Sequence, residues 1–405
     1  MLRKLGVSVA GASLFAAMLP EAKAAQVQPL TAGPVRGIYP VFDVTVYGAV
    51  GDGSTNDSSA IQNAINAAQL VGGIVWFPPA TYLLGTGLSV TNQVILAGAG
   101  WNIHGTKGSF LEVNNTSVTA ITVAASATGV IIRDLGIFHV QPTIGSGWSP
   151  SNYPPAIQVS GTDTYLCNLF LQNPTYGISV SNSSGTVGRV VIEHIWGQPL
   201  KEGITIDNAQ DVIKVDNIHF WPFWSTNSYV SSYILSSAIA IHSYRNDNPH
   251  FTRLFTYGYQ TGILFDTGST GVTSKFRVSN ADFDLCNYGI RVIGAGTTGQ
   301  IDNFTVQGPS GGGVSGLLAN ANNVIIQASN VRVSNELNNG IRITGTGTVL
   351  FFENTWIASW NISGSGFPGI EAVSPATVYV GYGRLFQSGN GASNTGGTGT
   401  VNLDS

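Results

Sequence analysis

The sequence has few charged residues. Of its 405 residues, 17 are Lys or Arg and 21 are Asp or Glu, so the formal net charge at neutral pH is −4. Proteins that bind nucleic acid need a basic surface, and this composition argues against one. The polarity comes instead from Asn, Ser and Thr, among 51 glycines, which suits a chain with many turns. Neutral or weakly charged glycans fit such a surface better.

Cysteine is scarce as well. The two cysteines are Cys167 and Cys286, and the repeat register described below separates them by several coils. At ~4.8 Å per coil they lie beyond the ~7 Å over which two Cα atoms can be bridged by a disulfide. We therefore expect two buried free thiols.

Long apolar runs are missing except near the N-terminus. Arg3 and Lys4 precede an apolar run over residues 5–19, and Ala22-Lys23-Ala24 then gives the small-x-small pattern that signal peptidase cuts. The run is short for a membrane span, and no later stretch offers ~18 uninterrupted apolar residues. We expect cleavage after Ala24 and a mature protein that is secreted or periplasmic, with no membrane span.

Pairs of a small residue and an aliphatic residue recur along the chain. Most neighbouring pairs lie 21 to 29 residues apart, and two gaps are longer, 36 residues before Ile157 and 35 before Ile239. A period in the twenties with short alternating strands is typical of a β-solenoid, in which each repeat packs on its neighbours. The pairs are Ala120-Ile121, Ala156-Ile157, Gly177-Ile178, Gly203-Ile204, Ala238-Ile239, Gly262-Ile263, Gly289-Ile290, Gly316-Leu317, Gly340-Ile341 and Gly369-Ile370.

A second marker, dominated by Asn, precedes most of these pairs. Asn tolerates unusual backbone dihedrals at tight turns, and its amide can bond the amides of neighbouring coils, so we interpret this column as structural. Strand alternation then directs the first and third residues after the marker inward, and the second and fourth outward. The marker residues are Asp134, Asn168, His194, Asn217, Arg253, Asn280, Asn303, Asn330 and Asn354.

Residues 42–84 read FDVTVYGAVGDGSTNDSSAIQNAINAAQLVGGIVWFPPATYLL. We expect Asp57 or Ser58 to cap a short helix that closes one end of the core. The segment resembles the N-terminal signature of the pectate-lyase-like β-helix superfamily, which includes polygalacturonases, rhamnogalacturonases, alginate epimerases and phage tailspikes. The apolar stripe of the helix is Ile61, Ala64, Ile65 and Ala68.

The resemblance and the repeat together predict an all-β fold, a single-stranded right-handed parallel β-helix (solenoid) with an N-terminal capping helix. We assign residues 1–24 to the signal peptide, 25–387 to the β-helix and 388–405 to a tail rich in Gly, Ser, Asn and Thr. The polygalacturonase motifs (Asn-Thr-Asp, paired adjacent aspartates, Arg-Ile-Lys) are absent, so no catalytic role is transferred from that family.

Asp282 and Asp284 are the first-ranked candidates for an acid and a base. As outward residues of one strand, they lie roughly 6.5 to 7 Å apart at the backbone, given a ~3.3 Å rise per residue. Inverting glycosidases hold their carboxyl groups ~6.5 to 9.5 Å apart, and like charges at this range push the two pKa values apart. The alternative is a solvated pair on an exposed strand.

Aromatic residues occupy the same outward face, and exposed rings stack on the flat apolar faces of sugars. His219 lies among them as a further candidate for acid or base, and Arg332 follows on the same face. Two alternatives to sugar binding would also explain the outward rings: a subunit interface, or cover by a loop. Tailspike relatives are trimers, so a homotrimer is possible. The candidate rings for substrate binding in this column are Trp196, Trp221, Phe255 and Tyr257, beside the outward Phe170.

Two longer insertions leave the coils just after this face, from about His139 to Pro155 and from Pro222 to Ser237. They carry Trp148 and Trp224, which we add to the candidate substrate-binding residues. Long loops on one side of a rigid solenoid usually serve binding, so we expect them to wall the groove on either side.

A second candidate acid and base column lies three residues after the small-apolar pairs. Asp207, His242 and Asp266 fall there on successive coils, which separates the carboxylates by ~9.6 Å with an imidazole between them. Both Asp residues also suit plain turns, and we rank that interpretation higher. Glu202 stands beside Lys201 and is interpreted as half of a surface charge pair.

The histidines show no short metal-ligand spacing, so we predict no cofactor, although scattered carboxylates would suffice for calcium in a lyase. Three functions remain open: a glycoside hydrolase with an aspartate pair, a polysaccharide lyase or epimerase acting on a uronic-acid glycan, and a glycan-binding or adhesion protein without chemistry. A lyase needs a cation to hold the uronic carboxylate, and the 17 Lys and Arg residues mildly favour the hydrolase.

Overall fold

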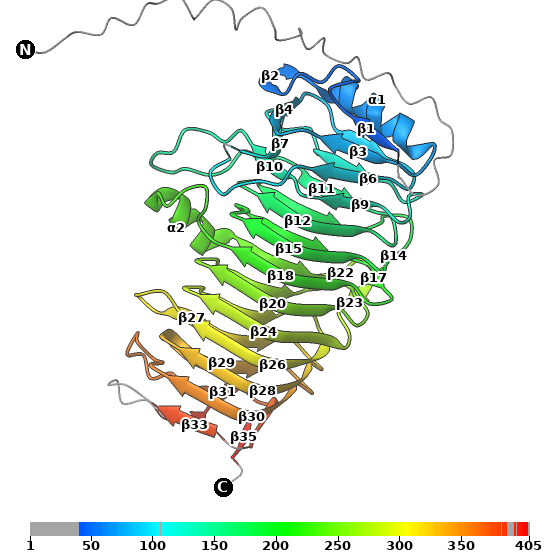
Figure 1. Cartoon of the computed structure of the whole chain (residues 1–405). Coiled ribbons are helices and arrows are strands. Elements are labelled where there is room, and N and C mark those ends of the chain that lie inside the picture. The colour runs from blue at the N-terminus through cyan, green and yellow to red at the C-terminus, as the bar shows by residue number, and fades with distance from the viewer. Residues whose placement is uncertain (1–39, 106, 382, 387–392, 394, 404–405) are drawn as a thin grey trace, which may run out of the picture. The chain divides into compact units, whose positions relative to one another are not determined.

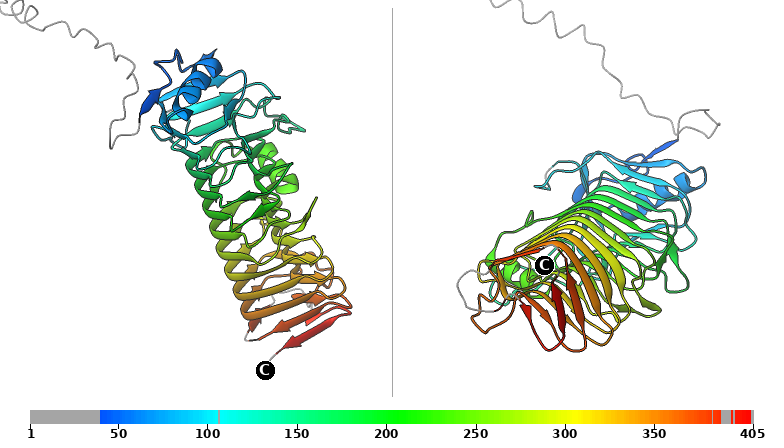
Figure 2. Two further views of the ribbon diagram at one scale, coloured as in Figure 1. Left: turned by 90° about the vertical axis from the view of Figure 1, so that its right-hand side faces the viewer. Right: turned by 90° about the horizontal axis from the view of Figure 1, so that it is seen from below.

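The computed structural model describes residues 40–105, 107–381, 383–386, 393 and 395–403, and these belong to one compact unit. The chain in this unit winds through stacked coils, with two parallel sheets running along the stack (Figure 1). Figure 2 shows the same coils from a second side and from the C-terminal end. The predicted right-handed parallel β-helix is confirmed. The predicted signal peptide and its cleavage site lie outside the described residues.

Most coils contribute one strand to each sheet. The larger sheet has nineteen strands in the described part of the chain: β1 (Val41–Asp43), β2 (Asp52–Asn56), β3 (Ile74–Phe77), β4 (Ala80–Leu84), β6 (Ile95–Gly98), β7 (Ser109–Val113), β9 (Ile131–Arg133), β10 (Gly136–His139), β12 (Tyr165–Leu171), β15 (Val191–Gly197), β18 (Lys214–Phe220), β20 (His250–Tyr257), β24 (Phe276–Asp284), β26 (Thr298–Gln307), β28 (Ile325–Ser334), β30 (Val349–Ala358), β32 (Thr377–Val380), β33 (Gly383–Phe386) and β35 (Thr400–Leu403).

The smaller sheet has twelve strands within the described residues: β5 (Leu88–Val90), β8 (Ile121–Val123), β11 (Pro155–Val159), β13 (Tyr176–Val180), β16 (Glu202–Ile206), β19 (Ile239–Ser243), β21 (Thr261–Phe265), β25 (Tyr288–Val292), β27 (Gly313–Asn320), β29 (Glu336–Thr344), β31 (Ile370–Ala372) and β34 (Thr395–Gly396). Two short pairs lie outside both sheets, β14 (Val187–Gly188) with β17 (Ala209–Gln210) and β22 (Thr267–Gly268) with β23 (Gly271–Val272). The two helices of the described part are α1 (Ser58–Gln69) and α2 (Ser228–Ser237).

The aliphatic residues of the recurring pairs form one inward row. Ile178, Ile204, Ile263, Ile290 and Ile341 lie in one row of the smaller sheet, and each is at most 1% exposed. One pair was assigned wrongly, because the row passes through Ile241 and not Ile239. Ala240-Ile241 repeats the composition of the preceding pair two residues later, so the pattern alone could not separate the two registers.

The glycine of each pair faces the interior where the coils approach closely. A Cβ at Gly289 would collide with Cγ2 of Val306 on the larger sheet, and it would lie 2.8 Å from the carbonyl oxygen of Gly316 on the next coil. Gly145 lies in the segment before β11, and a Cβ there would have no neighbour within 4 Å.

We expect Gly289→Ala to lower the free energy of unfolding by about 1–3 kcal/mol, because the added methyl overfills a packed interior. Gly145→Ala is the matched control and should change it by less than about 0.5 kcal/mol. Denaturant titration of both variants measures the difference. Equal stability of the two variants would contradict the close packing assigned to the glycine row.

The marker residues all adopt a left-handed backbone, with φ between 48° and 61°. Their side chains bond from coil to coil, as expected for a structural ladder. Nδ2 of Asn303 donates to Oδ1 of Asn280 at 2.6 Å, and Nδ2 of Asn354 donates to Oδ1 of Asn330 at 2.6 Å. This turn splits each long strand of the larger sheet into two segments and fixes which side chains face outward.

Helix α1 lies at the N-terminal end of the coils (Figure 1). Its predicted apolar stripe is buried. Asp57 precedes the helix, but its side chain forms no cap hydrogen bond to it. Its carboxylate instead accepts the backbone N–H groups of Val50 and Gly51 at 2.6 and 3.1 Å. Asp57 therefore ties the incoming loop to the helix, which corrects the predicted capping role.

Two further expectations need correction. Both cysteines are free, but only Cys286 is buried, whereas Cys167 is partly exposed because it directly precedes the marker residue Asn168. Strands β34 and β35 fall within the predicted tail and pair with β31 and β32, so coil structure continues past residue 387.

Candidate functional site

The outward column predicted on the larger sheet is formed. Trp196, His219, Phe255, Asp282 and Thr305 are paired in register on successive strands, and Arg332 follows one strand later. Trp221 and Tyr257 lie beside this column, with their ring centroids 4.3 Å apart. The pairing therefore brings the predicted aromatic and carboxylate residues onto one face.

One end of this column is covered. The ring of Trp101, which lies between β6 and β7, stacks on Phe170 at 5.0 Å, and Phe223 stacks on Trp196 at 5.6 Å. Phe170 is therefore fully buried, so its predicted outward exposure was wrong. At this end a loop covers the aromatic rings, which was one of the alternatives to sugar binding. Trp221, in contrast, is 38% exposed.

His219 lies within the aromatic cluster. Its ring centroid is 4.6 Å from that of Trp196 and 5.0 Å from that of Phe255, and burial lowers the pKa of its imidazole. A neutral imidazole between two aromatic rings extends the apolar surface. This environment favours a packing role for His219 over the predicted catalytic one.

Asp282 is exposed and Asp284 is partly exposed, as the alternation predicted. Neighbouring protein atoms displace water from Asp282 and, with the charge of Asp284, raise the pKa of its carboxyl, while the charge of Arg332 acts in the opposite sense. The Arg332 guanidinium itself lies 4.8 Å from the ring centroid of Trp356. The pair therefore lies on the outer face of the strand, between aromatic groups.

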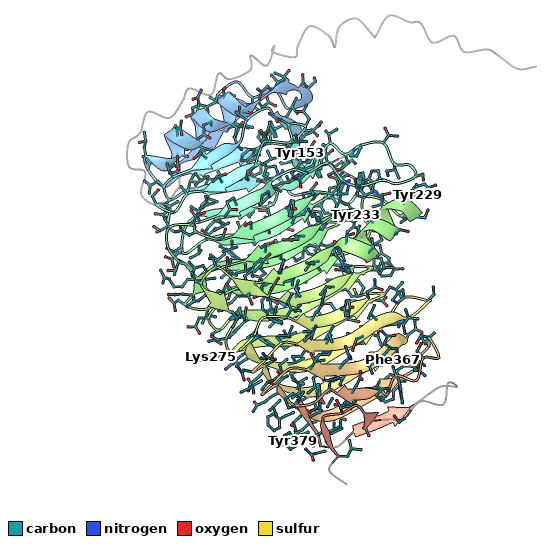
Figure 3. All side chains as sticks on the ribbon, turned by 180° about the vertical axis from the view of Figure 1, so that it is seen from behind. Tyr153, Tyr229, Tyr233, Lys275, Phe367 and Tyr379 are labelled. Atoms are coloured by element: carbon teal, nitrogen blue, oxygen red, sulfur yellow. The ribbon has the colours of Figure 1, made fainter. Side chains whose placement is uncertain are left out.

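The two long insertions are adjacent, which corrects the expectation that they wall a groove on either side. Trp148 of the first insertion lies 6.0 Å from Trp224 and 5.8 Å from Tyr233 of the second, measured between ring centroids. Trp148 and Trp224 therefore hold the insertions together, and Trp148 is only 8% exposed. In Figure 3, Tyr229 and Tyr233 project from α2, on the same side of the coils as Tyr153 of the first insertion.

The smaller sheet carries a second set of titratable groups beneath these insertions. The corrected register pairs His242 with Thr205 and Leu264, two positions before the predicted column. Its side chain nevertheless reaches two carboxylates. Nδ1 of His242 lies 3.5 Å from Oε1 of Glu202, and Nε2 lies 3.5 Å from Oδ2 of Asp266. The imidazole is thus held between two acids on two other coils.

Glu202 is the functional candidate that the sequence ranked too low. Its burial would raise the pKa of the carboxyl, but interactions with His242 and Thr205 and the charge of Lys201 lower it below its ordinary value. Oγ1 of Thr205 donates to Oε2 of Glu202 at 2.7 Å. The single sequence signal was a carboxylate at an outward strand position two residues before a buried isoleucine.

A hollow of about 430 Å³ opens beside Glu202 on the outer face of the smaller sheet. Tyr153 and Pro154 of the first insertion wall it, and Tyr176 and Ser179 of the preceding coil contribute to its floor. Lys201 lies 5.0 Å from the ring centroid of Tyr176. An acidic side chain therefore borders a concave site that also offers rings, hydroxyls and a nearby cation.

Tyr244 lies under this cluster, with its ring stacked on His242 at 4.0 Å. Burial and the charges of Glu202, Asp266 and Asp207 raise the pKa of Tyr244 to about 12, so its hydroxyl stays neutral. Oδ1 of Asp207 accepts the backbone N–H of Arg245 at 3.2 Å, so its carboxylate bonds to the following coil. Asp266, in contrast, combines its turn with the contact to His242.

Across residues 40–105 and 107–381, no group of three or more His, Cys, Asp or Glu side chains is placed to hold a metal ion. In the part of the chain that the structure describes, neither helix has the length and apolar character to cross a bilayer.

Comparison with known protein families shows which family the chain belongs to. Residues 41–291 match the family described as Rhamnogalacturonase A/epimerase, pectate lyase-like. The chain belongs to this family. No curated protein matches it. The family match confirms the resemblance inferred from residues 42–84. The matched part of this pectate-lyase-like chain contains both candidate sites, the cluster of Glu202, His242 and Asp266 and the pair Asp282 and Asp284.

Solved structures of similar fold include both enzymes and phage proteins. The Agl-KA catalytic domain has a TM-score of 0.62 at 14% identity, covering 92% of this chain and 69% of its own. The catalytic domain of a GH87 alpha-1,3-glucanase in complex with tetrasaccharides has a TM-score of 0.56 at 15% identity. The match covers 92% of this chain and 70% of that domain. The N-terminal fragment of bacteriophage phi29 gene product 12 has a TM-score of 0.52 at 15% identity. The match covers 86% of this chain and 71% of that fragment. At these identities the likeness establishes the fold.

Proposed function

We propose that this protein is a polysaccharide-active enzyme, a glycoside hydrolase with Glu202 as its general base and Asp266 as its general acid. The observation that carries the proposal is that Glu202 lines the hollow and contacts one ring nitrogen of His242, whose other ring nitrogen contacts Asp266. A pocket with convergent titratable groups is the best general indicator of an active site. The family and the glycosidase-like fold support a glycan substrate.

The lowered pKa of Glu202 keeps its carboxylate ionised, as a general base requires. In an inverting hydrolysis the base takes a proton from a water that attacks the anomeric carbon, and the acid protonates the leaving glycosidic oxygen. Glu202 and Asp266 contact opposite nitrogens of one imidazole at 3.5 Å each, so His242 links the two carboxyl groups. Asp266 is the acid in this assignment.

A lyase or epimerase is the second candidate, and Lys201 favours it. The ammonium group lies beside both Tyr176 and Glu202, where it could hold a uronic carboxylate while a base removes the neighbouring proton. A glycan-binding protein without chemistry is the third candidate, since a phage protein shares the fold.

An assay with a glycan panel separates these candidates. The mature protein is incubated with rhamnogalacturonan, α-1,3-glucan and uronic-acid glycans, while reducing ends and the absorbance of unsaturated uronic ends are followed. New reducing ends without unsaturation indicate hydrolysis, and both signals together indicate a lyase. Binding without either signal would contradict the proposed hydrolase.

The pH dependence of the reaction tests the role of Glu202. Because its pKa lies below the ordinary ~4.3 of a glutamate, we expect kcat/KM to fall on the acid side only below that pH. Thr205→Val removes a hydrogen bond to the ionised form, so it should raise this pKa and move the acid limb to higher pH. A pH–rate profile with an unmoved limb in Thr205→Val would argue against Glu202 as the base.

A further inference from the structure

The outer face of the larger sheet carries a strip of aromatic and polar side chains that the proposed site does not use. We infer that this strip, defined by Trp221, Phe255, Tyr257, Asp282, Asp284, Arg332 and Trp356, is a second glycan-binding surface. It would hold one polysaccharide chain along the coil axis. The inference uses the proposed function only for the class of ligand.

The aromatic part of the strip spans neighbouring coils. The ring centroid of Trp221 lies 6.1 Å from that of Phe255 and 4.3 Å from that of Tyr257. Trp221 is 38% exposed, and the other two rings are partly exposed. Together they form a continuous apolar surface with polar edges, onto which the apolar faces of successive sugar rings can stack.

The next coils supply hydrogen-bonding groups in the same rows. Asp282 pairs with Phe255 and Asp284 with Tyr257, and Arg332 lies two strands further along. The strip closes on a second ring, Trp356, which the Arg332 guanidinium covers. Rings at the two ends with carboxylates and a guanidinium between them match a ligand that presents both apolar faces and hydroxyl groups.

The same arrangement excludes a second protein copy as the preferred occupant. Protein interfaces place apolar groups at the centre and charged groups at the solvated rim. Here Asp282, Asp284 and Arg332 lie in the middle of the strip, so a dry protein interface would bury them at a large desolvation cost. A hydroxyl-rich chain can bond these groups without removing all water from them.

Helix α2 connects the strip to the proposed active site. A hollow of about 190 Å³ is lined by Tyr257 and Gly258 on one side and by Ser231, Ile234 and Leu235 of α2 on the other. Tyr233 of the same helix lies against Trp148 of the first insertion, which walls the hollow beside Glu202 through Tyr153. A long chain bound on the strip therefore ends near the segment that borders the catalytic groups.

The test compares two exposed aromatic pairs of the same sheet. The double variant Trp221→Ala/Tyr257→Ala removes two rings from one end of the strip, and Phe351→Ala/Tyr379→Ala is the matched control. That control pair stacks at 5.0 Å, is 40% and 43% exposed, and lies outside the strip. Binding of the full chain is measured by pull-down on α-1,3-glucan particles and by affinity electrophoresis in rhamnogalacturonan, with circular dichroism as the fold check.

We expect the strip variant to bind at least about tenfold more weakly and the control variant to bind like the wild type. Hydrolysis of the polymer should fall in the strip variant, whereas the control variant should hydrolyse it like the wild type. Trp221→Ala alone should give a smaller loss in the same direction.

Unchanged binding of a folded strip variant, an equal loss in the control, or no binding of either polymer by the wild type would overturn the inference. Glu202→Gln separates it from the proposed function. If that variant keeps full turnover, the active-site assignment fails while the binding result still decides the strip. If Glu202→Gln loses polymer binding while the folded strip variant binds like the wild type, the hollow holds the chain and the strip does not.

Discussion

Replacing Glu202 with Gln should lower kcat by about 10²- to 10⁴-fold, which is the usual loss when a general acid or base is removed. The amide has nearly the same shape and can still accept a hydrogen bond from Thr205, but it cannot take a proton from water. The carboxylate is partly exposed and lies on a rigid strand, so the thermal transition should move little. Steady-state kinetics on a tetrasaccharide, together with a melting curve, measure both effects.

Glu371→Gln is the matched control for this variant. Glu371 is an outward glutamate of the same sheet, paired with Arg342 at 2.6 Å and several coils away from the hollow, so kcat should stay at the wild-type value. Asp282→Asn and Asp284→Asn should also leave kcat on the tetrasaccharide within about threefold. If these two variants lose turnover while Glu202→Gln keeps it, the catalytic centre lies on the larger sheet.

The coils could be predicted from the sequence because their determinants repeat at a fixed spacing. Each inward isoleucine meets the isoleucine of the next coil, and each marker residue needs the same left-handed turn. One period therefore places many residues at once, including Asp282 and Phe255 in adjacent rows. The error at Ile239 arose where α2 interrupts the period and two small-apolar pairs stand side by side.

The candidate site was harder to predict because its contacts join residues far apart along the chain. Glu202 meets His242 across 40 positions, and the partners of that imidazole depend on a register that the insertion had displaced. Phe170 was expected to face solvent, yet Trp101 covers it from an irregular segment that no periodicity describes. Side-chain reach and loop placement are tertiary properties, and a one-dimensional pattern does not contain them.

A cluster of phenylalanine rings fills the interior beside the candidate site. Phe265 is fully buried, stacks on Phe276 at 4.1 Å and meets Phe251 edge-on at 6.0 Å. It joins the two sheets across the core, and the next residue is Asp266. A cavity at this position would therefore loosen both the coil and the carboxylate that contacts His242.

Phe265→Ala should lower the free energy of unfolding by about 3–5 kcal/mol, the cost of deleting a buried aromatic ring, and it should reduce turnover at temperatures below the transition. Phe351→Ala deletes the same atoms from an exposed ring and should cost less than about 1 kcal/mol. Guanidinium titrations of the two variants, followed by circular dichroism, give the difference in midpoint. Because each coil of a solenoid depends on its neighbours, a loss confined to the activity of Phe265→Ala, with an unshifted midpoint, would contradict the role of this ring in joining the sheets.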